Sequence, residues 1–254
     1  MQVSGSKAIM VGGASGMCRA TAERFVAKGG QVAILDLEKS DGAAVAERLG
    51  AFFLPCNVAY YDDMAKALDA AVERLGGVHF CLNTAGGGVA TKTLGRDGAM
   101  HPMDTFDGVV KLNLGASFNI NRHVARHMAR NEPNEEGERG VMINTASIAA
   151  FEGQIGQVAY AAAKSAIAGM TLTMARDLGS LGIRVMAMAP SLFATGMTSR
   201  IDKEFEERLV KDAAFPRRMG KPEEFATMAI AVFECPMMNG STIRIDGGQR
   251  FGPR

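Results

Sequence analysis

A glycine-rich segment between an apolar run and a helical pattern limits what this chain can fold into more than any other feature. The apolar run Lys7–Val11 is followed by Gly12, Gly13 and Gly16, and a helical pattern comes after them. Glycines let the backbone turn sharply here, so that N–H groups and the positive end of the helix point at one place. The segment therefore predicts a strand, turn and helix that bind the pyrophosphate of a dinucleotide.

The rest of the chain repeats this alternation of short apolar runs and helical patterns. We expect strands at Lys7–Val11, Gln31–Leu35, Ala51–Cys56, Val78–Asn83, Val141–Thr145, Arg184–Ala189 and Ser241–Ile245. We expect helices at Thr21–Lys28, Ser40–Leu49, Asp62–Leu75, Phe106–Asn131, Val158–Leu178, Asp202–Asp212 and Pro222–Phe233. Such alternation favours right-handed crossovers and a mostly parallel sheet with helices on both faces. No linker divides residues 1–254, so the prediction is a single doubly wound α/β Rossmann domain with seven strands.

Composition fits a globular protein and argues against several other classes. The 254 residues are 47% hydrophobic and 22% charged, which does not fit intrinsic disorder. The formal net charge of +1 makes neither nucleic acid nor an anionic membrane an expected partner. The chain shows no signal peptide and no apolar run of membrane-spanning length, and its four cysteines are too widely spaced for a zinc knuckle. We therefore expect a cytoplasmic protein with reduced thiols.

An acidic residue at the end of the second predicted strand bears on which dinucleotide binds. Asp36 follows Gly16 by twenty residues. A carboxylate at this place can accept hydrogen bonds from the adenosine ribose, and it would repel a 2′-phosphate. No basic residue stands beside Ser15 in the turn to receive that phosphate. The sequence therefore favours NAD over NADP, and the alternative is an aspartate that only caps a turn.

A serine, a tyrosine and a lysine after the fifth predicted strand form a candidate catalytic group. Ser147 follows the strand directly, and Tyr160 and Lys164 lie four residues apart on one face of a predicted helix. A neighbouring ammonium favours the phenolate, so we expect Lys164 to lower the pKa of Tyr160. Tyr160 can then accept a proton from an alcohol or return it to a carbonyl, while Ser147 hydrogen-bonds the same oxygen.

With these motifs together, the chain resembles the short-chain dehydrogenase/reductase family from about residue 7 to residue 248. The matching motifs are Val11-Gly12…Gly16-Met17-Cys18, Asp36, Asn83-Thr84-Ala85-Gly86, Asn113, Ser147…Tyr160…Lys164 and Pro190-Ser191…Thr195. The resemblance implies that Tyr160 is the acid/base, that Ser147 orients the substrate, and that Lys164 binds ribose and tunes Tyr160. It also implies that Asn113 holds a water in the proton relay.

The resemblance further implies which residues contact cofactor and substrate. The cofactor residues are Gly12, Ser15, Gly16, Met17, Asp36, Asn57, Val58, Asn83, Thr84, Ala85, Gly86, Tyr160, Lys164, Pro190, Phe193 and Thr195. The substrate residues are Ser147, Gln154 and Tyr160, within reach of a substrate-binding segment at about 191–221; Phe151, Phe193, Met197 and Phe215 are candidates for an apolar pocket. Three positions depart from the family pattern: Val11 replaces a threonine, and Cys18 and Ser191 replace glycines.

Within the family, the chain is most similar to a subgroup that oxidises 3-hydroxyacyl-CoA thioesters, hydroxysteroids and simple alcohols. This similarity implies hydride transfer between NAD and a secondary alcohol or ketone, in a homotetramer. Arg217, Arg218 and Lys221 either meet the phosphates of CoA or form an ordinary solvated surface. His123 and His127 have metal-ligand spacing but no evident third ligand, so we expect no metal site.

Two other functions stay open at this point. An NADPH-dependent 3-ketoacyl reductase would use the same residues in the opposite direction, although Asp36 argues against it. A non-catalytic dinucleotide-binding regulatory protein would carry Cys18 and Ser191 as marks of a decayed site. The intact Ser147, Tyr160 and Lys164 argue against that second alternative.

Overall fold

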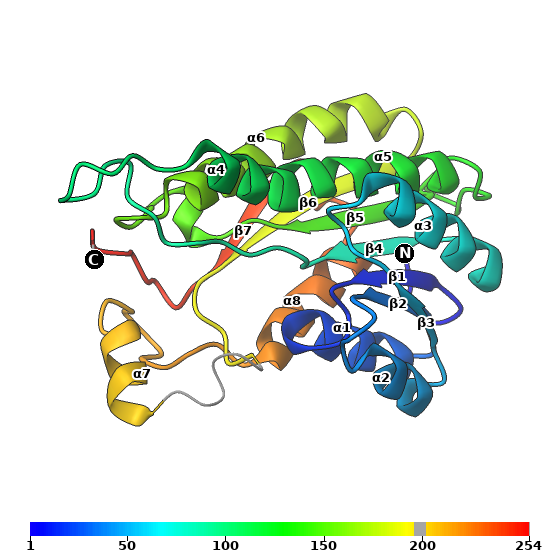
Figure 1. The fold of residues 1–254 in the computed structure, drawn as a ribbon. Helices are drawn as coiled ribbons and strands as arrows, with labels where there is room; N and C mark the ends of the chain where they lie inside the picture. The colour runs from blue at the N-terminus through cyan, green and yellow to red at the C-terminus, as the bar shows by residue number, and fades with distance from the viewer. Residues whose placement is uncertain (196–201, 254) are drawn as a thin grey trace.

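The computed structural model describes residues 1–195 and 202–253, which form a seven-stranded sheet between layers of helices (Figure 1). All neighbouring strands are parallel, in the order β3-β2-β1-β4-β5-β6-β7. The order reverses between β1 and β4, and a sheet of this kind binds its ligand beyond the carboxyl ends of such strands. The predicted fold is confirmed. The strands are β1 (Lys7–Val11), β2 (Gln31–Asp36), β3 (Phe52–Pro55), β4 (Phe80–Asn83), β5 (Gly140–Thr145), β6 (Ile183–Pro190) and β7 (Thr242–Ile245).

Helices cover both faces of the sheet because alternate strand residues are apolar toward both sides. On one face Ile9 packs with side chains of α3, α5 and α6, and on the other Met10 packs with side chains of α1, α2 and α8. The rings of Phe25, Phe80 and Phe233, from α1, β4 and α8, lie with centroids 5.2–5.7 Å apart on this second face. The helices are α1 (Gly16–Ala27), α2 (Gly42–Leu49), α3 (Tyr61–Leu75), α4 (Met103–Val110), α5 (Ala116–Met128), α6 (Val158–Gly179), α7 (Lys203–Leu209) and α8 (Pro222–Glu234).

The helix predicted as one unit at Phe106–Asn131 is divided in the structure. It begins earlier, at Met103, and a π-helical turn over Lys111–Gly115 separates α4 from α5. A single wider turn leaves the apolar spacing of the sequence almost unchanged, so the pattern predicted one regular helix. Such turns occur frequently at functional sites, and Asn113 lies at the centre of this one.

A buried ion pair joins the loop before β5 to strand β6. The Arg184 guanidinium donates to the Glu138 carboxylate, and both side chains are 7% exposed. Arg184 also donates to the carbonyls of Val232, Phe233 and Met238, at 2.8–2.9 Å. Arg184 therefore satisfies two carbonyl groups at the carboxyl end of α8, where the helix itself supplies no N–H partner, and a third in the segment that follows the helix.

The short helix α7 lies outside the two helix layers, below the end of the chain in Figure 1. It belongs to the segment of about 191–221 that the sequence assigns to substrate binding. Of the helices in residues 1–195 and 202–253, none combines the length and the apolar character needed to cross a bilayer.

Candidate active site

A cavity of about 650 Å³ opens beside the glycine-rich turn, beyond the carboxyl ends of the central strands. Its walls come from the β1–α1 turn, the end of β2, the segments after β3 and β4, and Thr195. The structure thus brings together predicted cofactor residues from five separate parts of the chain. They are Gly12, Ser15, Gly16, Met17, Asp36, Asn57, Val58, Thr84, Ala85, Gly86 and Thr195.

The conformation of the turn depends on glycine at two positions. Gly12 has a φ of 80° and Gly16 a φ of 56°, in the left-handed region. A Cβ on Gly12 would stand 2.8 Å from Thr84 Oγ1, and one on Gly16 would stand 2.9 Å from Thr195 Cγ2. The first N–H groups of α1 have no partner within the helix and face the cavity end of the sheet. This arrangement of close backbone and helix end fits the pyrophosphate of a nicotinamide dinucleotide.

Asp36 holds the turn in place while it lines the cavity. Its Oδ2 accepts the N–H of Ala14 at 2.9 Å, and its Oδ1 accepts the N–H of Leu37 at 2.7 Å. Each carboxylate oxygen can accept a further hydrogen bond. Asp36 therefore stabilises the turn through two hydrogen bonds and can still accept hydrogen bonds from the hydroxyl groups of a ribose.

Cys18, which replaces a glycine of the family pattern, points away from the cavity. Its side chain is fully buried, and its Sγ donates to the Val11 carbonyl at 3.5 Å. Burial raises the pKa of the Cys18 thiol, so the thiol stays protonated. The cysteine fills space between α1 and the sheet and leaves the cavity lining unaltered.

Ser147, at the end of β5, comes together with Tyr160 and Lys164 of α6. None of the three lines the cavity, but Gly86 of the lining lies beside Lys164. The Ser147 hydroxyl lies close enough to Tyr160 to act on the pKa of that phenol. The Lys164 ammonium is buried, donates to the Thr145 carbonyl at 2.7 Å, and lies 5.6 Å from the centre of the Tyr160 ring. Gly88 adjoins Tyr160 so closely that a Cβ there would stand 2.9 Å from the ring. The predicted trio is thus one contiguous group.

The residues of the protein itself raise the pKa of Tyr160, so the prediction that Lys164 lowers this pKa is wrong. Burial raises the pKa of Tyr160, and the nearby Ser147 hydroxyl opposes this rise in the pKa only in part. Burial also lowers the pKa of Lys164 to about 8. The spacing on the helix is as predicted, but withdrawal of the phenolate from water dominates its pKa.

Asn113 connects the π-helical turn to the segment after β4. Its Nδ2 donates to the carbonyls of Gly87 and Val109 at 2.7 and 2.8 Å, and its Oδ1 accepts the N–H of Gly87 at 3.2 Å. Gly86 is close enough that a Cβ would stand 2.5 Å from Asn113 Oδ1 and 3.4 Å from Lys164 Nζ. Asn113 therefore fixes the chain beside the catalytic group, and its role toward a water stays a prediction.

Several predicted residues lie behind or beside the cavity. Asn83 is buried, donates to Ser117 and accepts the N–H of Ala85, so it shapes the segment after β4. Pro190 ends β6, and Phe193 packs edge-on against Phe225 in the core. Gln154 lines a separate cavity of about 400 Å³ between residues 91–94 and 153–158. Met197 lies outside the described residues.

The sequence missed six residues that line the cavity. Four of them adjoin predicted residues along the chain: Leu35, Leu37, Cys56 and Ala59. The other two are Gly108 of α4 and Leu112 of the π-helical turn. Their spacing of four residues places Gly108 and Leu112 on one helix face, which was the signal available for them.

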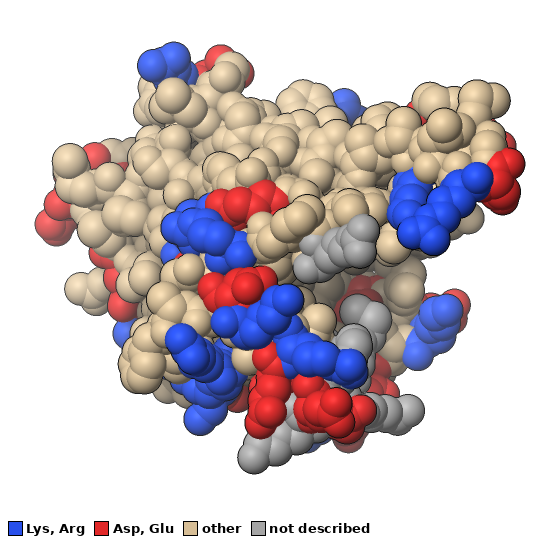
Figure 2. All heavy atoms as spheres, turned by 90° about the vertical axis from the view of Figure 1, so that its left-hand side faces the viewer, with Lys and Arg blue, Asp and Glu red and all other residues tan. Residues whose placement is uncertain are grey.

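Two of the remaining candidates pair with acidic side chains. Arg218 donates to both oxygens of Glu224, at 2.9 and 2.6 Å, and this holds the pKa of Glu224 at about 2. Figure 2 shows Lys and Arg side chains interspersed with Asp and Glu on this side of the molecule. His127 Nε2 lies 2.6 Å from Asp69 Oδ1, and the described ranges hold no group of three potential metal ligands.

Known proteins match the chain across the sheet and every segment that lines the cavity. Residues 6–206 match the family described as short chain dehydrogenase. A Homo sapiens protein named 3-hydroxyacyl-CoA dehydrogenase type-2 is 45% identical over 254 residues, 99% of this chain and 97% of that protein. The crystal structure of 3-hydroxyacyl-CoA dehydrogenase type-2 from Mycobacterium avium has a TM-score of 0.93 at 41% identity and 98% coverage of both chains. A 7 alpha-hydroxysteroid dehydrogenase complexed with NADH and 7-oxo glycochenodeoxycholic acid has a TM-score of 0.87 at 27% identity, covering 100% of this chain and 97% of that one.

Proposed function

Because the chain belongs to the short-chain dehydrogenase family and is therefore an oxidoreductase, we propose that it transfers a hydride between NAD and a secondary alcohol or ketone. The group of Ser147, Tyr160 and Lys164 carries this proposal, because its Lys164 lies beside Gly86, which lines a cavity of dinucleotide size. A bound nicotinamide supplies the acceptor for hydride in oxidation and the donor in reduction.

The side chains divide the proton chemistry between them. Ser147 orients the substrate oxygen, and Tyr160 takes the hydroxyl proton in oxidation or returns it in reduction. The hydrogen bond from Lys164 to the Thr145 carbonyl holds the ammonium beside the Tyr160 ring. In that position the positive charge stabilises the phenolate that forms when Tyr160 gives up its proton. Burial of both groups limits the access of water and strengthens their mutual electrostatic interaction.

The preference for NAD rests on Asp36. Its carboxylate lines the cavity with acceptor capacity to spare, which favours ribose hydroxyls and disfavours a 2′-phosphate. The neighbour complexed with NADH supports a nicotinamide dinucleotide in general, and Asp36 supports NAD in particular.

An apolar substrate is supported by exposed side chains around the catalytic group. Val89, Phe151, Ile155 and Phe215 are large, apolar and exposed, and they lie on the segments that adjoin Tyr160 or belong to the substrate-binding segment. Apolar groups exposed in this way are typical of a binding surface. Together with the names of the relatives, they favour a 3-hydroxyacyl-CoA or a hydroxysteroid-like substrate. Because Arg218 is paired with Glu224, phosphate contacts from this region would fall to Arg217 and Lys221.

The homotetramer implied by the family resemblance is part of this proposal. Phe118 on α5 and Leu172 on α6 are exposed apolar residues on the helix layer of the first sheet face. Contact between copies of the chain would cover them.

The function is tested by following NADH formation with a panel of 3-hydroxyacyl-CoAs, hydroxysteroids and small secondary alcohols. Turnover of at least one class with NAD supports the proposal. Turnover only with NADPH and 3-ketoacyl substrates would favour the reductase. Tight NADH binding without turnover of any member would favour the regulatory dinucleotide-binding protein.

The Asp36→Asn variant should lower the ratio of kcat/KM with NAD to kcat/KM with NADP by roughly 10- to 150-fold, because a hydrogen bond to a charged group contributes about 1.5–3 kcal/mol. Asparagine keeps the shape of the side chain and loses the charge that repels a 2′-phosphate. The control is Asp41→Asn, the same change at an exposed residue whose side chain makes no cap hydrogen bond. A wild-type preference for NADP would contradict the proposed role of Asp36.

A further inference from the structure

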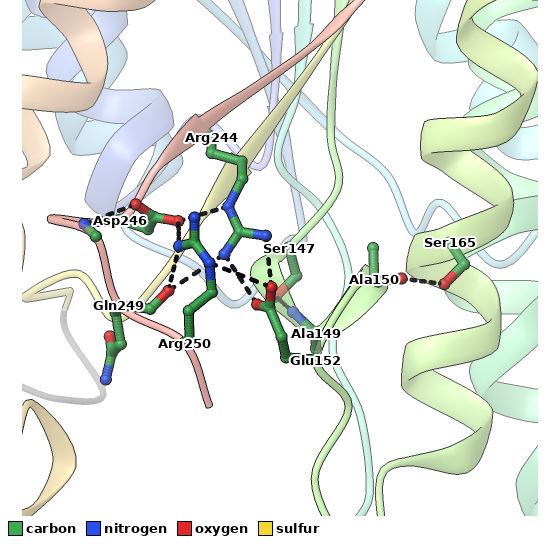
Figure 3. A network of polar contacts seen from close by, with 10 residues as sticks. Ser147, Ala149, Ala150, Glu152, Ser165, Arg244, Asp246, Gln249 and Arg250 are labelled. Atoms are coloured by element: carbon green, nitrogen blue, oxygen red, sulfur yellow. Dashed lines mark hydrogen bonds and ion pairs between the residues drawn. The ribbon is translucent and has the colours of Figure 1, made fainter. Parts of the chain in front are cut away.

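The segment that carries Ser147 has little regular structure to hold it. Ser147 Oγ accepts the N–H of Ala149 at 3.1 Å, and only the short 3₁₀ helix Ile148–Ala150 follows. Ser165 of α6 donates to the Ala150 carbonyl at 2.6 Å and holds one side of the segment (Figure 3). We call residues 147–152 the serine segment. Its other side needs support from elsewhere, because a single 3₁₀ turn is weakly hydrogen-bonded.

Arg244 of β7 supplies that support through Glu152, the last residue of the serine segment. Its two terminal nitrogens donate to the two Glu152 oxygens, at 2.8 and 2.9 Å. The Arg244 guanidinium also lies 5.1 Å from the centre of the Phe151 ring. Both members of the ion pair are 23% exposed. A two-point contact between half-buried groups defines one geometry better than a surface ion pair does.

The same arginine is tied to the end of the chain, which we call the C-terminal strap (residues 246–253). Arg244 donates to Asp246 at 2.6 Å and to the Gln249 carbonyl at 3.2 Å (Figure 3). Arg250 also donates to Asp246, at 3.0 Å. The strap returns to the loop after the serine segment, where Ile155 donates to the Pro253 carbonyl at 3.0 Å.

The strap also forms hydrogen bonds with the substrate-binding segment. The Gln249 side chain is 1% exposed and donates to the Leu209 carbonyl at the end of α7, at 2.8 Å. The Gly247 carbonyl accepts the N–H groups of Ala214 and Phe215, each at 3.0 Å. The strap therefore contacts the serine segment on one side and the substrate-binding segment on the other.

We infer that Glu152 and Arg244 are positioning residues, which fix Ser147 relative to the substrate-binding segment through the C-terminal strap. The inference rests on the proposed function of Ser147. One guanidinium meets Glu152, Asp246 and the Gln249 carbonyl at once, which an ammonium cannot do in the same geometry. None of these groups lines the cofactor cavity. The pair should therefore affect the reaction of the substrate and leave cofactor binding alone.

The test compares Glu152→Gln and Arg244→Lys with wild type. We expect kcat/KM for the alcohol to fall about tenfold in each variant, because small misplacements of an orienting group are costly. The dissociation constant for NADH should stay within about twofold, since the cofactor contacts are unchanged. Glu234→Gln is the matched control, because it breaks an exposed ion pair with Lys28 between α1 and α8, away from the site.

The pH profile separates a positioning role from a merely structural one. The nearby Ser147 hydroxyl lowers the pKa of Tyr160, so a displacement of Ser147 raises it. Oxidation requires the deprotonated tyrosine, and the acidic limb of kcat/KM should therefore move to higher pH in Glu152→Gln. A lower melting temperature with kcat/KM and the pH profile unchanged would overturn the inference.

Hydrogen exchange keeps this result distinct from a failure of the proposed function. In Glu152→Gln we expect amides of the serine segment and of residues 209–215 to exchange faster together, because the strap joins them. If the wild type turns over no substrate, the proposed function fails while the exchange experiment still decides on the strap. Unchanged exchange at residues 209–215 would show that the strap does not couple the two segments.

Discussion

Replacement of Tyr160 by phenylalanine should lower kcat for alcohol oxidation by roughly 10²- to 10⁴-fold, the usual contribution of a positioned general acid or base. The variant keeps the ring that packs against Gly88 and near Lys164, and it loses the hydroxyl that exchanges the proton. Ser147 would still orient the substrate oxygen, but a hydroxyl with a pKa near that of an alcohol is a poor base. Initial rates of NADH formation with saturating substrate measure the loss.

Two measurements make this result specific. The dissociation constant for NADH should change little in Tyr160→Phe, because the turn and Asp36, which line the cavity, are the residues proposed to bind the far end of the cofactor. Tyr60→Phe removes the same hydroxyl from an exposed tyrosine and should behave as wild type. Activity of Tyr160→Phe within a fewfold of wild type would refute the mechanism.

Replacement of Arg184 by methionine should reduce the free energy of unfolding by about 3–5 kcal/mol, the usual cost of removing one partner of a buried ion pair. The change takes away one of the two cations that face Glu138, the other being the Met1 ammonium at 2.9 Å, and the donors for two carbonyls at the end of α8 and for the Met238 carbonyl beyond it. Methionine fills much of the volume, so the loss reports the polar contacts more than a cavity. Urea unfolding followed by circular dichroism measures it.

The matched control for Arg184→Met is Lys28→Met. Lys28 donates to Glu234 at 2.6 Å, also between separate elements, but both side chains are about 40% exposed. Exposed pairs contribute about 0–1 kcal/mol, so this variant should remain close to wild type. Equal losses in the two variants would show that burial is not what makes the Arg184 contacts important.

What could be predicted from the sequence followed from local patterns. The period of the apolar runs predicted the strands and their parallel arrangement, and the glycine turn predicted the cofactor cavity. The four-residue spacing of Tyr160 and Lys164 predicted a shared helix face, and the structure places the two side chains together with Ser147.

What could not be predicted depends on contacts between distant residues. The raised pKa of Tyr160 is a consequence of burial, which the helix spacing does not reveal. The π-helical turn at Lys111–Gly115 leaves the apolar pattern intact. Glu152 and Arg244 are 92 residues apart, and each is an ordinary charged residue in sequence.

The aromatic cluster of Phe25, Phe80 and Phe233 limits how far the protein can fold during translation. Two of its rings leave the ribosome early, and the third arrives only with α8, near the end of translation. Until then the sheet face formed by β1 and β4 has no cover from α8, and a nascent chain presents apolar surface of the kind that chaperones bind. A chain that stops before residue 222 would carry the whole lining of the cavity and still be prone to aggregate.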